Sequence, residues 1–197
     1  MAHHAADLIA LLERAQTGPV AFVGLSMGGY IAFELLRRRP DLVGALVLAG
    51  TRAEADSGQG KERRRTLARM VTEEGVDGFV DEFLPGLLSA TSARERPDLV
   101  AQVRQIMVGT SPAGVAGSLL GMADRAETTG LLESIGVPTL IVAGREDRAI
   151  PLEAAETMHR AIRGSSLAWL PGGHLVNLEH AAEFNRELVR FLHEHWT

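Results

Sequence analysis

The chain has 197 residues, 46% of them hydrophobic, with a formal net charge of −5 and no cysteine. This size and composition suit a globular α/β domain, and the acidic balance excludes a broad basic surface for nucleic acid. Without cysteine, disulfides and thiolate metal sites are excluded. No apolar stretch approaches the ~20 residues of a membrane span. The N-terminus lacks a signal-peptide pattern, so we expect a cytoplasmic protein with no membrane partner.

A helix, a strand and a second helix are predicted at the start of the chain. Apolar residues recur on one face over 5–15, and a buried strand follows over 19–25. A helical pattern then runs over 27–39 and stops before a proline. The sequence GLSMG, centred on Ser26, joins strand to helix, and this is the G-x-S-x-G pattern of a nucleophile elbow. The pentapeptide alone also fits an ordinary glycine-rich turn in which Ser26 caps the helix.

The rest of the chain alternates between apolar runs and helical patterns. Three further buried strands are predicted, at residues 43–49, 138–143 and 166–170. The region between the first two of these, 53–129, is charged, helix-patterned and free of comparable strand runs. Two helices, over 152–162 and 179–196, close the chain.

Two loops that follow predicted strands carry the partners that an activated serine needs. Asp147 follows the strand at 138–143, and His174 follows the strand at 166–170. Functional groups of open α/β sheets collect beyond the carboxyl ends of the strands. The order serine, acid, histidine along the chain differs from the orders found in the two other serine-protease folds. These loops therefore favour an acid, Asp147, that orients a base, His174.

The chain resembles the α/β-hydrolase superfamily, and most closely its small capped esterases, enol-lactone hydrolases and cofactor-free haloperoxidase-like enzymes. The resemblance rests on the segments GLSMGGYIAFELLRRRPDLVGALVLAGTR, PTLIVAGREDRAIP and LPGGHLVNLEHAAEFNRELVRFL. It implies that Ser26 is the nucleophile, Asp147 the orienting acid and His174 the base. It also implies that the Met27 amide is one donor of the oxyanion hole.

The implied architecture is a partial α/β-hydrolase fold of about four parallel strands flanked by helices. We expect residues 1–52 to hold the first part of the core with the elbow, 53–129 to form a helical cap, and 130–197 to complete the core. Relatives normally carry several strands and a His-Gly loop before the elbow, whereas here one helix precedes it. The first strand is therefore expected to be an exposed edge, and the chain is expected to be poorly soluble or oligomeric.

Other titratable residues are weaker candidates for these roles. Glu146, beside Asp147, is an alternative acid, and Asp124 and Glu127 are expected to be surface charges. The remaining histidines lie at the N-terminus or within helical patterns, at positions 3, 4, 159, 180, 193 and 195. None of them has metal-ligand spacing, so neither a metal nor another cofactor is expected.

The expected function is hydrolysis of a carboxylic ester, lactone or related acyl bond in a small molecule through a Ser-His-Asp triad. The alternative is an N-terminally truncated protein of the same fold that is catalytically weak, binds a small ligand without turnover, or is the product of an incomplete gene. The alternative follows from the missing His-Gly loop, because that loop supplies the second oxyanion donor.

Overall fold

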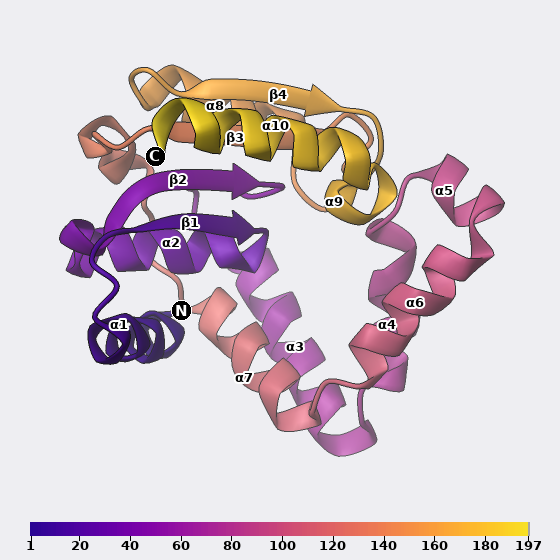
Figure 1. Ribbon diagram of the computed structural model, residues 1–197. Coiled ribbons are helices and arrows are strands. Elements are labelled where there is room, and N and C mark those ends of the chain that lie inside the picture. Colours follow the sequence, from indigo (N-terminus) through magenta and orange to yellow (C-terminus); the bar gives the residue numbers. More distant parts are fainter. Residues whose placement is uncertain (197) are drawn as a thin grey trace.

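Four parallel strands form one sheet in the order β1-β2-β3-β4 in the computed structural model, which describes residues 1–196 (Figure 1). The strands are β1 (Val20–Leu25), β2 (Val43–Ala49), β3 (Thr139–Gly144) and β4 (Ser166–Leu170). Each lies within one residue of its predicted bounds. The runs VGALVLA and TLIVAG are almost wholly buried, as expected of parallel strands covered on both faces.

Helices cover both faces of this sheet. One face packs against α2 (Met27–Arg38) and α8 (Leu152–Ala161), and the other against α10 (Ala181–His195) (Figure 1). The first helix, α1 (Ala2–Ala15), packs beside α2. The last helix, predicted over 179–196, begins two residues later, at Ala181, because His180, with φ −129° and ψ 56°, separates it from the short α9 (Val176–Glu179).

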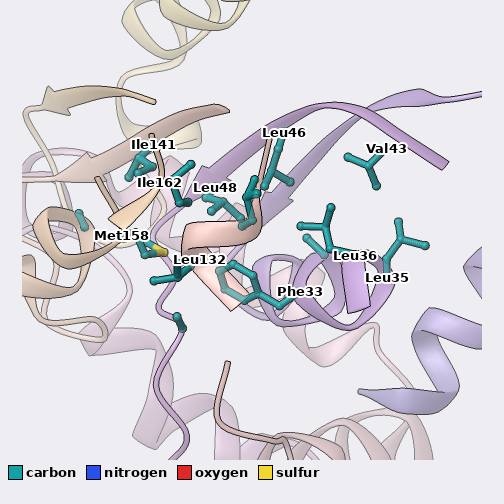
Figure 2. Packing of buried hydrophobic residues seen from close by; sticks show 14 of the residues in the cluster. Phe33, Leu35, Leu36, Val43, Leu46, Leu48, Leu132, Ile141, Met158 and Ile162 are labelled. Carbon is teal, nitrogen blue, oxygen red and sulfur yellow. The ribbon is translucent and has the colours of Figure 1, made fainter. Parts of the chain in front are cut away.

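The alternation of side chains along β2 explains the two layers. Leu46 and Leu48 point toward α2 and α8, whereas Val47 lies in the cluster under α10. Figure 2 shows the first of these clusters, in which side chains from α2, β2, β3 and α8 meet. Its labelled members are Phe33, Leu35, Leu36, Val43, Leu46, Leu48, Leu132, Ile141, Met158 and Ile162.

Five α-helices are inserted between β2 and β3, in the region over 53–129 that was predicted to be helical. They are α3 (Gly58–Glu74), α4 (Asp77–Phe83), α5 (Ala90–Glu95), α6 (Pro97–Val108) and α7 (Pro112–Ala123). Ser57, Ser89 and Ser111 start three of them, each accepting a hydrogen bond from the backbone amide three residues on. The division into core and cap stays a prediction.

The inserted helices extend beyond the carboxyl ends of the strands, with α3 and α7 side by side (Figure 1). Leu175 and Leu178, which follow β4, pack into the cluster formed by α4 and α6 and join the two parts of the chain. Over residues 1–196, no single helix is long and apolar enough to cross a membrane. The consecutive helices α6 and α7 pass that test only together, with a bend of 91° between them.

The first strand is an edge of the sheet, as expected. It pairs with β2 alone among the described strands, and α10 lies over β3 and β4 (Figure 1). Val23, in the middle of β1, is 44% exposed, whereas its partner Val47 on β2 is 1% exposed. An apolar strand edge of this kind is a site where another chain can pair. Self-association through it stays a prediction.

Candidate active site

The serine of the GLSMG turn is held in a strained backbone conformation between β1 and α2. Ser26 has φ 51° and ψ −112°. Residues with a side chain rarely adopt this conformation, because it costs ~1–3 kcal/mol. Its amide donates to the Ala49 carbonyl oxygen at 2.8 Å, and its own carbonyl oxygen accepts from the Thr51 hydroxyl at 2.8 Å. Hydrogen bonds to Ala49, at the end of β2, and to Thr51, two residues later, therefore hold the turn.

The glycines around Ser26 have different steric roles. A Cβ atom on Gly24 would lie 2.6 Å from the carbonyl carbon of Gly28, and one on Gly29 would lie 2.4 Å from the Thr51 hydroxyl oxygen. A Cβ atom on Gly28 would meet nothing within 4 Å. The Ser26 hydroxyl makes no capping hydrogen bond to α2, so the turn is not built around a serine cap.

The predicted acid and base are in direct contact. Nδ1 of His174 lies 2.9 Å from Oδ2 of Asp147, and the two side chains are 5% and 3% exposed. Oδ1 of Asp147 accepts the amides of Ala149 at 2.8 Å and Ile150 at 2.9 Å, which fixes the carboxylate on its loop. Since Nδ1 donates to the carboxylate, Nε2 of the neutral ring is left as a proton acceptor.

The serine and the histidine lie around the same short segment at the end of β2. The Ser26 amide is bonded to Ala49, and a Cβ atom on the next residue, Gly50, would lie 3.3 Å from Nδ1 of His174. No hydrogen bond joins the Ser26 hydroxyl to the imidazole within the described part of the chain. Such contacts are often long in unliganded enzymes. Met27 is the first residue of α2, so its amide has no partner inside the helix.

The alternative candidates lie elsewhere. Glu146 is exposed and contributes only its amide, which donates to Gly172 at 2.8 Å. Of the other histidines, His159 contacts Ser165, and His180 lies 3.9 Å from Glu183. The rest belong to α1 and α10. No group of three or more His, Asp or Glu side chains that could hold a metal ion occurs in residues 1–196.

Glu127, expected to be a surface charge, ties together the two ends of the inserted segment. Its carboxylate accepts the amides of Ala55 at 2.8 Å and Thr129 at 3.1 Å. Partial burial raises its pKa, but these backbone hydrogen bonds outweigh that effect and hold the pKa below its usual value. Both Glu127 and Asp124 are exposed, as expected, and Asp124 lies 3.1 Å from Arg65.

Sequence reasoning missed a buried carboxylate that supports the histidine loop. Glu179 accepts the amide of Gly173 at 2.6 Å and the amide of Ser89 at 2.9 Å. Burial raises its pKa, yet the hydrogen bonds from Ser89, Ser92 and Gly173 outweigh burial and hold the pKa below its usual value. Because Gly173 precedes His174, this carboxylate ties the histidine loop to the start of α5. Nothing local distinguishes Glu179 from a surface helix residue.

A second buried carboxylate, also missed, organises the segment after β2. Asp56 is paired with Arg52, with Arg64 at 2.5 Å and with Arg125 at 2.8 Å. Burial raises its pKa, but the arginines outweigh burial and hold the pKa at about 2. The Arg125 guanidinium also lies 4.1 Å from the ring centre of Tyr30 on α2. This cluster joins α3 to α2 and to the segment that follows β2.

A strained turn between a strand and a helix, with two further loops beyond later parallel strands of the same sheet, is the arrangement of an α/β-hydrolase fold. The chain belongs to the α/β hydrolase family, which it matches over residues 2–187. It is similar to 3-oxoadipate enol-lactonase 2 of Acinetobacter baylyi, with 27% identity over 91% of this chain and 66% of that one.

Solved structures give the same result. A malate-bound thermophilic esterase from Thermogutta terrifontis has a TM-score of 0.95 and 36% identity, covering 98% of this chain and 72% of that one. The enol-lactonase of Burkholderia xenovorans has a TM-score of 0.85 and 29% identity, covering 95% and 71%. The chain thus spans about two thirds to three quarters of the length of these proteins. The family and its named members make it a hydrolase.

Proposed function

We propose that this protein hydrolyses a carboxylic ester, a lactone or a related acyl bond of a small molecule, using Ser26, His174 and Asp147. The observation that carries the proposal is the buried contact of 2.9 Å between His174 and Asp147, beside a serine in strained backbone geometry. The similar proteins named an esterase and enol-lactonases support an acyl substrate.

The residues have complementary roles in the proposed reaction. The Ser26 oxygen attacks the substrate carbonyl while Nε2 of His174 accepts the hydroxyl proton, and Asp147 stabilises the resulting imidazolium. The Met27 amide donates to the oxyanion. His174 then returns the proton to the leaving alkoxide, and a water activated in the same way releases the acid from the acyl-enzyme. We propose that the inserted helices cap this site, because Leu175 beside His174 packs against them.

A second candidate is a protein of the same fold that binds a small ligand with weak or no turnover. It is favoured by the lack, among residues 1–196, of a hydrogen bond between the Ser26 hydroxyl and His174. The elbow itself also contributes only one oxyanion donor, Met27. Losing one such donor costs on the order of 10²–10³ in kcat. The two candidates differ in turnover and in the reactivity of Ser26.

A fluorophosphonate probe, together with a panel of p-nitrophenyl esters, tests the proposal. We expect the probe to label Ser26, and Ser26→Ala to abolish labelling and lower ester turnover by about 10³-fold or more. Ser134→Ala, at an exposed serine bonded to Leu131, is the matched control and should keep both activities. Labelling that persists in Ser26→Ala would refute the assignment, and absence of both activities in the unmodified chain would favour the second candidate.

A further inference from the structure

A hollow of about 300 Å³ lies between α3, the end of α4 with the turn that follows it, and the loop after Asp147. Its apolar wall includes Leu67, Phe83 and Leu87. Its charged lining consists of four arginines and two carboxylates, namely Arg52, Arg63, Arg64, Arg148, Asp56 and Glu82. The excess of positive charge is local, since the chain as a whole carries −5.

The carboxylates of the lining do not neutralise its arginines. Asp56 is shared among three guanidinium groups, one of them Arg125 from outside the lining. Nε of Arg52 is buried without a hydrogen-bond partner. Arg148 contacts two backbone carbonyl oxygens, those of Pro85 at 2.9 Å and Leu88 at 3.4 Å, and has no carboxylate partner in residues 1–196. Since its partners are neutral carbonyl oxygens, Arg148 keeps a guanidinium charge that an anionic ligand in the hollow can neutralise.

The exposed ion pair between Arg63 and Glu82 borders the hollow, and its arginine is accessible to a ligand. Nη2 of Arg63 lies 2.8 Å from Oε1 of Glu82, and these side chains are 65% and 43% exposed. An exposed pair of this kind contributes little to stability. A ligand carboxylate can therefore compete with Glu82 for Arg63, because a guanidinium binds carboxylates through paired, parallel hydrogen bonds.

The hollow flanks the proposed catalytic residues. Arg52 follows Thr51, whose hydroxyl is bonded to the Ser26 carbonyl, and Arg148 follows Asp147. Ser26 and His174 do not line it. Arg148 is adjacent in the chain to Asp147, and Arg52 to Thr51, so each of these lining residues has its Cα atom about 4 Å from that of its neighbour at the proposed site. A carboxylate in the hollow could therefore lie at the far end of an acyl chain whose ester carbonyl is at Ser26.

We propose that this hollow binds the carboxylate group of a small organic acid carried on a short apolar chain. The carboxylate has two sources, the far end of the acyl substrate or a separate dicarboxylate ligand. The substrate source rests on the proposed function, whereas the binding site itself does not. The apolar wall and the small volume favour a carboxylate on a hydrocarbon chain over a bare inorganic anion.

Titration calorimetry of the Ser26→Ala protein with adipate, at constant ionic strength, tests binding without turnover. We expect Arg63→Gln to weaken binding about fivefold or more, and Glu82→Gln to tighten it about threefold or more by freeing Arg63. The controls are Arg94→Gln and Glu95→Gln, from an exposed pair on α5 outside the hollow, and they should not change the affinity. A loss of packing would not move the two test variants in opposite directions.

Three results would overturn the inference: no adipate binding at tens of millimolar, the same sign of effect for Arg63→Gln and Glu82→Gln, or inorganic phosphate binding as tightly as adipate. Kinetics with monomethyl adipate and methyl hexanoate then identify the source. If the substrate supplies the carboxylate, Arg63→Gln raises KM for the charged ester and not for the neutral one. Equal effects on both esters, with adipate binding retained, assign the site to a separate ligand. Adipate binding without hydrolysis of either ester would count against the proposed function and leave the site standing.

Discussion

Replacing Glu179 by glutamine removes the charge that joins the histidine loop to the inserted helices while keeping the size of the side chain. The carboxylate accepts two backbone amides, from Gly173 at 2.6 Å and from Ser89 at 2.9 Å, and the residue is 6% exposed. A glutamine has one carbonyl oxygen and one amide group. It can therefore accept one of these amides and must present a donor to the other.

The structure sets the size of the effect. One buried amide left without an acceptor costs ~1–3 kcal/mol, and the remaining bond loses the strength that an ionised acceptor gives it. We expect Glu179→Gln to destabilise the protein by about 2–3 kcal/mol, which is a fall in Tm of roughly 4–12 °C for a chain of this size. Because Gly173 precedes His174, loss of this support should also displace the histidine. We therefore expect fluorophosphonate to label Ser26 more slowly even at temperatures well below Tm, where the variant is folded.

Thermal unfolding followed by circular dichroism, at neutral pH, measures the first effect, and the labelling rate at 20 °C below Tm measures the second. Glu133→Gln is the matched control, since Glu133 is exposed and should change stability by no more than about 0.5 kcal/mol. A Glu179→Gln protein that melts within a degree of the unmodified chain would refute the argument that this carboxylate supports the loop.

Two further predictions concern the elbow and the buried arginine cluster. Gly24→Ala should destabilise the protein by about 3 kcal/mol, because the new Cβ atom would lie 2.6 Å from a backbone atom. Gly28→Ala should be neutral or stabilising, because its Cβ atom would meet nothing within 4 Å. Equal melting temperatures for the two variants would contradict this prediction. Asp56 has a folded pKa of about 2, below its usual 3.8, so its contribution of about 2 kcal/mol is present above pH 3.8 and is lost as pH falls toward 2. Urea unfolding between pH 5 and 2 measures this loss, and Asp56→Asn should show a shallower fall in stability over the same range.

The amino-acid sequence by itself determined the strands and the turn that presents Ser26. Strands buried on both faces need continuous apolar runs, so the segments ending at Ala49 and at Gly144 could be located to within a residue. Gly24 and Gly29 could be recognised because the sharp strand-to-helix turn excludes side chains at these two positions. The loops of Asp147 and His174 could be placed because parallel strands end at one edge of a sheet.

Only the tertiary structure decided which of these groups touch and what supports them. Asp147, rather than the neighbouring Glu146, meets His174, since the choice between adjacent carboxylates depends on how one loop turns against another. Glu179 reaches Ser89 across 90 residues of sequence, and Asp56 collects arginines from three separate segments. The start of the last helix at Ala181, directly after His180, likewise follows no local signal. Which donors and acceptors meet in the interior depends on how distant segments pack together. The spacing of residues along the sequence does not specify these contacts.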